Sequence, residues 1–219
     1  MPAAAQQHHR DRGNNVDICL PQAELRYRPA LLSDDLARHF AGELLEPGKL
    51  SWRCDDIEMF GRLVKQPRLT VWMADEGVRY RYSGISHSPQ PWIAPISELR
   101  KMAETAAQCS FNSVLINQYR NGHDHVGWHR DNEPELGVEP VIATLSLGAT
   151  RFFDLRHRDY RNNKLAVQRF ELQSGDLIVM RGLTQQHWQH RVPRQTRITE
   201  PRLNLSFRRV IQTSMPKAR

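Results

Sequence analysis

The clearest strand of this 219-residue chain reads Pro201-Arg202-Leu203-Asn204-Leu205-Ser206-Phe207-Arg208. Side chains alternate sides along an extended chain, so one face of this segment is apolar and the other polar. The apolar face carries Leu203, Leu205 and Phe207, and the polar face carries Arg202, Asn204, Ser206 and Arg208. Two guanidinium groups and an amide on one face suit an anionic ligand, because guanidinium binds carboxylate through paired hydrogen bonds. Taken alone, the segment also fits an edge strand whose polar face is solvated.

The spacing of the two arginines limits what they can bind together. At about 3.3 Å per residue, Arg202 and Arg208 are roughly 20 Å apart along a straight strand. They therefore cannot share one carboxylate, but long side chains that lean inward bracket a short diacid.

Other short strands precede this one. From Phe111 onward the pattern predicts strands over residues 114–119, 141–147, 151–157, 165–172, 176–180 and 186–192, and the strand quoted above follows them over 203–210. Turn signals at Asn121-Gly122, Gly148 and Gly175 separate several of them, which favours an antiparallel sandwich or barrel over βαβ units. Upstream, Ser33 caps an expected helix over residues 34–45, and a second helix is expected over 96–109.

We therefore predict an α+β fold whose core is a double-stranded β-helix, or jelly roll. Residues 1–16 are polar and without period, and we expect them to form a disordered tail. Residues 17–219 form one domain, with supporting helices and short strands over about 17–110 and the jelly roll over about 111–210.

Composition narrows the class of partner and the compartment. Lys and Arg number 31 against 24 Asp and Glu, a formal net charge of +7, which favours a polyanion such as nucleic acid. A solvated basic surface is the alternative. Three widely spaced cysteines without a Cys-x-x-Cys pair indicate reduced thiols in an intracellular protein. No apolar run reaches the roughly 20 residues of a membrane helix, and no secretory signal is found, so we expect no membrane partner.

A metal site is expected around His129-Arg130-Asp131. In an extended segment His129 and Asp131 point to the same side, and a second histidine would complete a two-histidine, one-carboxylate triad that leaves Fe(II) open positions for oxidant and co-substrate. The candidates for that histidine are His187 and His190. They are three residues apart on an expected strand and face opposite ways, and the residues alone leave the choice open.

A second polar strand face precedes the metal segment. Asn117 and Tyr119 share a face with Leu115, and their amide and phenol groups can hydrogen-bond a carboxylate. In isolation the same residues are simply a strand that leads into the turn at Asn121-Gly122.

Taken in order, these segments resemble the AlkB family of Fe(II)/2-oxoglutarate-dependent nucleic-acid dealkylating dioxygenases. The similarity spans roughly residues 57–210 and is greatest to the branch of the nuclear mammalian DNA-repair homologues. The resemblance implies that His129, Asp131 and His190 are the catalytic metal ligands. It also implies that 2-oxoglutarate is bound by Asn117, Tyr119, Arg202, Asn204 and Arg208.

The resemblance further assigns the N-terminal half to a nucleotide-recognition lid. The implied substrate-binding residues are Phe60, Gly61, Arg62, Trp72, Tyr80, Tyr82 and Glu133. Trp72 or Tyr80 would stack on a flipped base, although both also fit strand aromatics packed in a core. Glu133 would attract a base that alkylation has made cationic, whereas its alternative is an exposed loop acid.

The implied activity is oxidative demethylation of 1-methyladenine and 3-methylcytosine in DNA, with RNA as a further substrate. Fe(II) is the cofactor, 2-oxoglutarate and O2 are co-substrates, and formaldehyde and succinate are released, which constitutes direct-reversal repair of DNA alkylation. We expect a cytoplasmic monomer, nucleoid-associated in a bacterium and nuclear in a eukaryote. Two alternatives are a 2-oxoglutarate oxygenase acting on a protein or small molecule, and an inactive nucleic-acid-binding relative.

Basic residues outside the site are candidates for phosphate contacts, with a solvated surface as the alternative. They are Arg62, Lys65, Arg68, Arg156, Arg158 and Arg161. The last three were expected at the tip of a hairpin.

Overall fold

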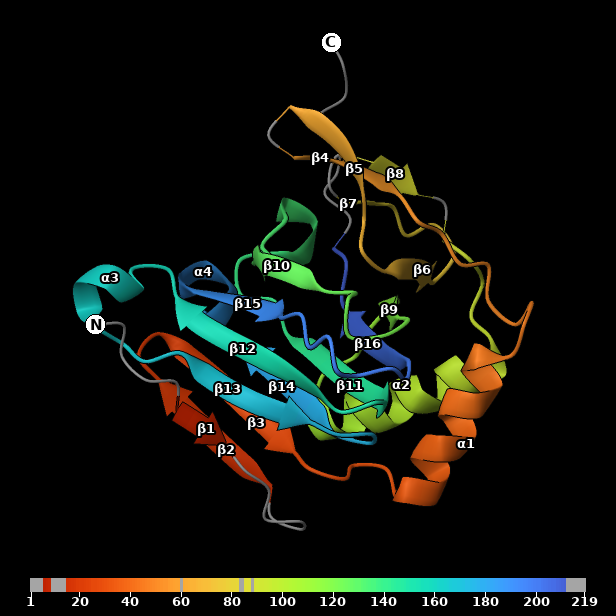
Figure 1. Ribbon diagram of the computed structural model, residues 1–219, viewed down its shortest axis with the longest axis horizontal. Coiled ribbons are helices and arrows are strands. Elements are labelled where there is room, and N and C mark those ends of the chain that lie inside the picture. The colour runs from red at the N-terminus through yellow and green to blue at the C-terminus, as the bar shows by residue number, and fades with distance from the viewer. Residues whose placement is uncertain (1–5, 9–14, 60, 83–84, 88, 212–219) are drawn as a thin grey trace.

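Two facing β-sheets form the centre of the computed structural model, and two longer helices cover the outer face of the larger sheet (Figure 1). The structure describes residues 6–8, 15–59, 61–82, 85–87 and 89–211, of which 6–8, 57–59, 80–82 and 85–87 are described by their backbone alone. The predicted α+β jelly roll is confirmed.

The larger sheet is seven-stranded and antiparallel, with β16 near its centre. Its order is β2 (Val16–Leu20), β3 (Ala23–Arg28), β14 (Leu177–Arg181), β11 (Ile142–Gly148), β16 (Arg202–Arg208), β9 (Ser113–Tyr119) and β6 (Leu69–Ala74). β16 pairs with β11 on one side and β9 on the other, so the solvated edge strand considered for this segment is excluded. The strands β2, β3 and β6 come from the part of the chain before residue 110. The larger sheet therefore includes strands from both sides of that residue.

The smaller sheet is five-stranded and has β10 at one edge. Its order is β1 (Gln6–His8), β13 (Gln168–Leu172), β12 (Arg151–His157), β15 (Trp188–Val192) and β10 (Val126–His129). β1 pairs in parallel with β13, so part of the segment expected to be a disordered tail is a strand. Edge pairing of this kind depends on the partner strand, and a polar sequence without period gives no sign of it.

Two small hairpins project beyond the sheets at one end of the molecule (Figure 1). One consists of β4 (Asp56–Met59) and β5 (Arg62–Lys65), and the other of β7 (Tyr80–Tyr82) and β8 (Ile85–His87). The helical elements are α1 (Asp34–Leu45), α2 (Ala94–Ala107), η1 (Pro134–Leu136), α3 (Tyr160–Asn163) and α4 (Thr184–His187). Within the described residues, none of these helices has the length and apolar character required to cross a membrane.

The two expected helices form because their apolar residues share a face that the sheet buries. Ser33 caps α1, and its side chain accepts a hydrogen bond from the amide of Leu36 at 3.3 Å. α2 begins at Ala94, two residues earlier than predicted, with Pro95 in its first turn, and it ends where Gln108 takes a left-handed conformation with φ 54°.

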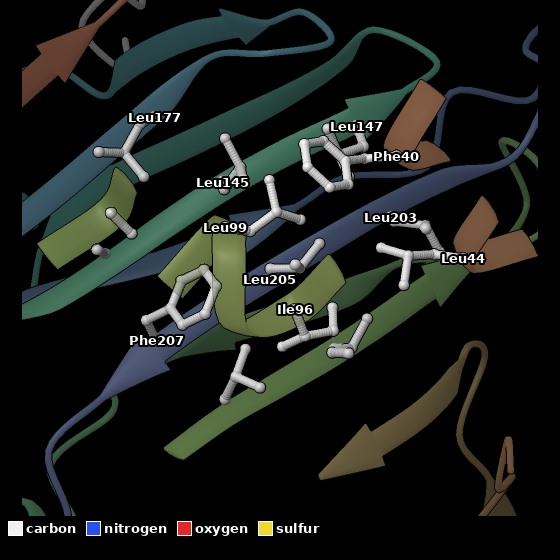
Figure 2. Close-up of a cluster of buried hydrophobic side chains, with 14 of the residues drawn as sticks. Phe40, Leu44, Ile96, Leu99, Leu145, Leu147, Leu177, Leu203, Leu205 and Phe207 are labelled. Atoms are coloured by element: carbon white, nitrogen blue, oxygen red, sulfur yellow. The ribbon is translucent and has the colours of Figure 1, made fainter. Parts of the chain in front are cut away.

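The main apolar core lies between these helices and the larger sheet. Figure 2 shows Phe40 and Leu44 of α1 and Ile96 and Leu99 of α2 packed on the apolar face of β16, Leu203, Leu205 and Phe207. A second buried cluster lies between the two sheets and includes Tyr27, Ile142, Phe153, Leu155, Phe170, Ile178 and Trp188. Both faces of β16 are therefore buried, one against helices and one against the smaller sheet.

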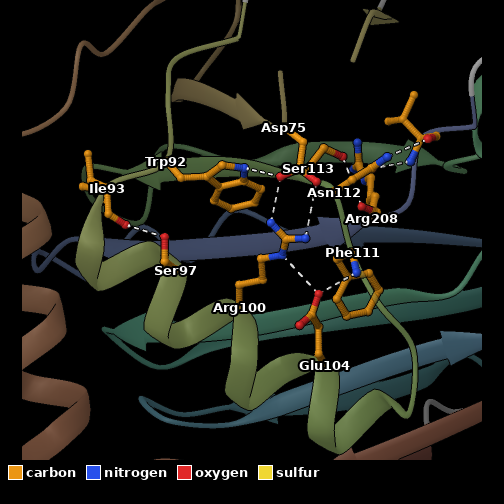
Figure 3. Close-up of polar contacts among 11 residues, drawn as sticks. Asp75, Trp92, Ile93, Ser97, Arg100, Glu104, Phe111, Asn112, Ser113 and Arg208 are labelled. Atoms are coloured by element: carbon orange, nitrogen blue, oxygen red, sulfur yellow. Dashed lines mark hydrogen bonds and ion pairs between the residues drawn. The ribbon is translucent and has the colours of Figure 1, made fainter. Parts of the chain in front are cut away.

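A polar network ties α2 to the end of β6 (Figure 3). Arg100 donates to Asp75 Oδ1 at 2.8 Å and to Glu104 Oε1 at 3.1 Å, and the indole of Trp92 donates to Asp75 at 2.7 Å. Glu104 also accepts the amide hydrogen of Phe111, which precedes β9, at 2.8 Å. The network joins the helix to two strands of the larger sheet through charge-assisted hydrogen bonds.

The loops that lead into β10 and β16 are held together at Gly122. Its amide donates to Ile198 O at 2.8 Å and its carbonyl accepts from the amide of Gln195 at 2.9 Å. A Cβ atom at Gly122 would lie 1.8 Å from the carbonyl oxygen of Gln195, so only glycine fits here. The buried guanidinium of Arg151 donates to the carbonyl oxygens of Asn121, Asp124 and Pro193. These hydrogen bonds hold both loops in place.

Truncation of the central strand should test how much the helix-facing core contributes. Leu205→Ala removes a fully buried side chain and should lower the free energy of unfolding by about 2–5 kcal/mol, because the cavity does not fully collapse. Leu63→Ala, at a side chain that is 76% exposed, should change it by less than about 0.5 kcal/mol. Urea denaturation measures both, and equal effects would contradict this description of the core.

Candidate metal and co-substrate site

Strand register brings His129 and His190 together. His129 ends β10 and His190 lies in the middle of β15, and the two residues are directly paired across these antiparallel strands. Their ring centroids are 4.2 Å apart. Directly opposite residues on one face of a sheet are the closest pairs that two strands offer, so the pairing alone places two imidazoles at one point.

Asp131 reaches the same point from the loop after β10. Its amide donates to Gln185 Oε1 of α4 at 3.0 Å, and its Oδ2 accepts from Arg208 of β16 at 2.6 Å. The second oxygen, Oδ1, is buried, has no hydrogen-bond partner in the part of the chain that the structure describes, and lies 3.8 Å from His129 Nε2. Ligand atoms of Asp131, His129 and His190 all lie within 4.8 Å of one another, and a buried carboxylate oxygen without a partner fits a metal ligand.

The tautomer of His129 suits metal binding. Its Nδ1 lies 2.9 Å from the carbonyl oxygen of Gly127, an acceptor, so the proton sits on Nδ1. Nε2 is left with a free lone pair directed to the side of Asp131. A hydrogen bond from the other ring nitrogen is the usual way in which proteins orient a histidine ligand.

The charge states also fit a metal. Burial, reinforced by the neighbouring His129, lowers the pKa of His190 to about 3. Burial raises the pKa of Asp131, but the charge of Arg208 and then those of the two histidines outweigh it and lower the value to about 2. At neutral pH the site therefore holds a neutral imidazole and a carboxylate, the forms that bind metal.

His187, the other candidate from the sequence, lies away from this point. It was expected to share a strand with His190, but it ends the short helix α4, and the strand begins at Trp188. Its ring stacks on that of His157, with centroids 5.9 Å apart and an interplanar angle of 13°. The helical turn breaks the alternation on which the expected opposite facing of the two residues was based.

On the polar face of β16, Asn204, Ser206 and Arg208 line the same pocket, and the guanidinium of Arg202 is hydrogen-bonded to the first of them. Arg202 is 1% exposed, and its Nη2 donates to Ser146 Oγ at 2.8 Å and to Asn204 Oδ1 at 2.9 Å, while Nε and Nη1 have no hydrogen-bond partner among the described residues. Burial lowers the pKa of Arg202 to about 10, which still leaves it charged at neutral pH. Because a buried cation without a counter-ion is costly, this arrangement fits a carboxylate ligand.

The side-chain amide of Asn204 forms its hydrogen bonds with other residues of β16. Its Oδ1 accepts from Arg202, and its Nδ2 donates to Ser206 Oγ at 3.0 Å. Both groups of the amide are therefore oriented by neighbours, and Asn204 in turn holds the guanidinium of Arg202.

Asn117 and Tyr119 of β9 face the pocket beside β16, as does Leu115. The ring of Tyr119 lies between two guanidinium groups, with Arg151 and Arg202 each 5.4 Å from its centroid. Asn117 Oδ1 accepts from Arg68 Nε at 2.8 Å. Arg68 was expected to contact phosphate at the surface, but it is 5% exposed and lines this pocket.

Three residues in and around the site were missed as site residues in the sequence. Arg68, Arg151 and Gln185 are all buried polar side chains. No periodic pattern marks them, because their burial results from loops and strands that meet only in the folded chain. Of the three, the sequence indicated a function only for Arg68, as a candidate for phosphate contact.

The described residues predicted to bind substrate lie on separate elements and are not gathered at one point as the metal ligands are. Gly61, with φ 72°, and the exposed Arg62 lie at the β4–β5 turn. Trp72 is half-buried and packs against a small cluster of Ala74, Val78, Leu136 and Val210. Glu133 is half-buried and directly precedes η1. Phe60 lies outside the described residues, and only the backbone of Tyr80 and Tyr82 is described.

A jelly roll that holds a two-histidine, one-carboxylate group close to a buried arginine defines the class of Fe(II)/2-oxoglutarate oxygenases. The sequence model of the 2OG-Fe(II) oxygenase superfamily matches residues 24–208. The human protein "DNA oxidative demethylase ALKBH2" is 38% identical over 161 residues, which cover 72% of this chain and 62% of that protein. Human "Alpha-ketoglutarate-dependent dioxygenase alkB homolog 3" is 43% identical over 152 residues, covering 67% of this chain and 52% of that protein.

This chain belongs to the AlkB family of the 2OG-Fe(II) oxygenase superfamily, which confirms the resemblance seen in its motifs. It spans 58% of the length of the bovine "DNA oxidative demethylase ALKBH2", another relative that it matches. The solved structure of OsALKBH1 shares the fold, with a TM-score of 0.59 at 18% identity, over 88% of this chain and 98% of that one.

The low pKa of His190 should make the metal-free protein sensitive to acid. Between pH 6.5 and about 3 the unfolded chain protonates His190 while the folded chain does not, so stability falls as the pH falls. With EDTA present, wild-type protein should lose about 1.4 kcal/mol more than His190→Asn between pH 7.5 and 5.5. Urea unfolding at the two pH values measures this.

The matched control is His123→Asn, at an exposed position, which should lose stability in parallel with the wild type. If His190→Asn also runs parallel to the wild type, His190 is not held neutral in the folded protein.

Proposed function

We propose that this protein is an Fe(II)- and 2-oxoglutarate-dependent dioxygenase that demethylates N-alkylated bases in DNA. The carrying observation is that His129, Asp131 and His190 line one pocket together with Asn204, and that Asn204 is hydrogen-bonded to the buried guanidinium of Arg202, which has no acidic partner among the described residues. The names of the relatives, DNA oxidative demethylase and alkB homolog, support nucleic acid as the substrate class.

In this proposal each group of residues has a separate task. His129, Asp131 and His190 hold Fe(II), and Arg208 keeps Asp131 ionised by pairing with the oxygen that the metal does not need. Arg202 receives a carboxylate of 2-oxoglutarate, held in position by Asn204 and Ser146. Asn117 and Tyr119 provide further polar contacts to the same co-substrate.

When bound, Fe(II) with 2-oxoglutarate and O2 supplies the oxidising power that places one oxygen atom on the N-methyl carbon and the other in succinate, with loss of CO2. The hydroxymethyl product then breaks its C–N bond. The bonding electrons stay on the ring nitrogen, the hydroxyl proton is released, and formaldehyde leaves a neutral base behind. The protein contributes geometry and an enclosed polar pocket, whereas the hard chemical step belongs to the cofactor.

The base must leave its stack to reach this pocket, at a cost of a few kcal/mol that is smaller where damage has already weakened pairing. We assign Phe60, Gly61, Arg62, Trp72, Tyr80 and Tyr82 to the surface that receives it. Glu133 lies two residues beyond Asp131 and supplies a negative charge for a cationic base such as 1-methyladenine or 3-methylcytosine. RNA as a further substrate, a monomeric state and an intracellular location complete the proposal.

The first test is the reaction itself. Purified protein with Fe(II), ascorbate, 2-oxoglutarate and a 1-methyladenine oligonucleotide should remove one methyl group, and Asp131→Ala should abolish the loss, because it removes an iron ligand. Mass spectrometry of the oligonucleotide measures the reaction. Succinate without methyl loss on DNA or RNA would retain the oxygenase and overturn the nucleic-acid substrate. Absence of both products with metal bound would leave an inactive binding protein.

The second test concerns the charge of the lesion. Glu133→Gln should lower kcat/KM for the cationic 1-methyladenine by about fivefold to tenfold, roughly 1–1.4 kcal/mol, while leaving neutral 1-methylguanine nearly unchanged. Glu135→Gln, two residues along the chain, is the matched control. A uniform loss on both bases would show that Glu133 acts through structure rather than through recognition of charge.

A further inference from the structure

On the outer face of the smaller sheet, one tryptophan ring contacts two arginines. Trp128 lies on β10, with the guanidinium carbon of Arg156 (β12) 4.3 Å and that of Arg191 (β15) 4.4 Å from its ring centroid. These three strands lie beside one another in Figure 1. Arg156 was expected at a hairpin tip but belongs to β12.

Both arginines are anchored within the sheet. Arg191 Nε donates to Asp154 Oδ2 at 2.9 Å, and Arg156 Nε donates to Gln189 Oε1 at 3.0 Å. Asp154 is fully buried and also accepts from Arg169 at 2.7 Å. Guanidinium groups held in this way are in position for an aromatic face, and cation–π contacts of this geometry are attractive. Their anchoring favours a role within the protein over capture of an external anion.

Strand β10, which carries Trp128, has few backbone contacts that fix its position in the smaller sheet. It lies at the edge, and β15 is its one partner among the described strands. Its register is irregular between Val126 and His129, with the exposed Gly127 in the gap. An edge strand with a shifted register is weakly specified by its backbone hydrogen bonds.

The contact that orients His129 spans Trp128. His129 Nδ1 is bonded to the carbonyl oxygen of Gly127, so the direction of Nε2 depends on the conformation of three consecutive residues whose middle member is Trp128. The arginines come from the positions beside the second ligand: Arg191 follows His190, and Leu155, which precedes Arg156, pairs with His190. The outer clamp and the inner histidine pair therefore sit on opposite faces of the same three strands.

We infer that Trp128, held by cation–π contacts with Arg156 and Arg191 (the outer clamp), is a positioning residue for the metal ligand His129. It touches neither metal nor substrate, and it acts by holding the segment of residues 127–129 in the conformation that points Nε2 at Asp131. This inference rests on the proposed metal site and adds to it a device on the far side of the sheet.

The test measures metal affinity without catalysis. Mn(II) is titrated into metal-stripped protein, and the free ion is counted by electron paramagnetic resonance. Trp128→Leu keeps apolar bulk and removes the aromatic face, and it should raise the Kd for Mn(II) by about tenfold, as loss of support around a ligand does. Trp128→Phe keeps an aromatic face and should stay within about threefold of the wild type.

Phe152→Leu is the matched control. Phe152 lies on the same face of the same sheet under Arg169, which is 4.6 Å from its ring, but on β12 instead of the ligand strand. Its Kd for Mn(II) should equal that of the wild type. If Trp128→Leu does not fold, Arg156→Met and Arg191→Met each remove one cation and leave the ring, and each should raise the Kd by about threefold.

The outcomes separate this inference from the proposed function. If Trp128→Leu lowers the melting temperature but leaves the Kd within twofold of the wild type, the clamp is merely structural and the inference is overturned, while the metal site stands. If wild-type protein and His190→Ala bind Mn(II) equally, the metal site itself is wrong, and the inference fails with it.

Discussion

The opposite chemistry of the two faces of β16 organises this protein. Its apolar face is covered by α1 and α2, and its polar face forms the wall of the pocket, so a single strand belongs to both the core and the site. β9 and β11 bind it on either side by seven and six residue pairs in register. Because a shift of one residue would exchange the faces, the stability of the core fixes Arg208 in the pocket wall and Arg202 next to the lining residue Asn204.

Charge balance within the pocket follows from this placement. Arg208 compensates Asp131, whereas Arg202 has only neutral hydrogen-bond partners among the described residues. One cation therefore completes the metal-binding group and the other remains to attract an anion. The two arginines are six positions apart on one strand, so the cation that pairs with Asp131 and the cation left for an anion are held at separate points.

Much of the architecture could be predicted because it depends on local patterns. The helix at residues 34–45 follows from a capping serine and an apolar stripe, and the alternation in β16 predicts a strand. Prediction failed where tertiary contacts override local pattern. The helical turn that carries His187 interrupts an expected strand, and β1 gains its structure from the edge of β13. Nothing in the neighbouring sequence indicates that Arg68 is buried, because its hydrogen-bond partner Asn117 lies 49 residues further along the chain.

The sequence by itself determined the fold class, the family and the ligand types, since alternation, capping and motif order are properties of neighbouring residues. It left the choice between His187 and His190 open until family resemblance favoured one. Only the tertiary structure decided which histidine faces His129, which arginine pairs with Asp131, and that the ring of Trp128 contacts both Arg156 and Arg191. These contacts join residues tens of positions apart, and their geometry is set by strand register and loop packing, which exist only once the chain has folded.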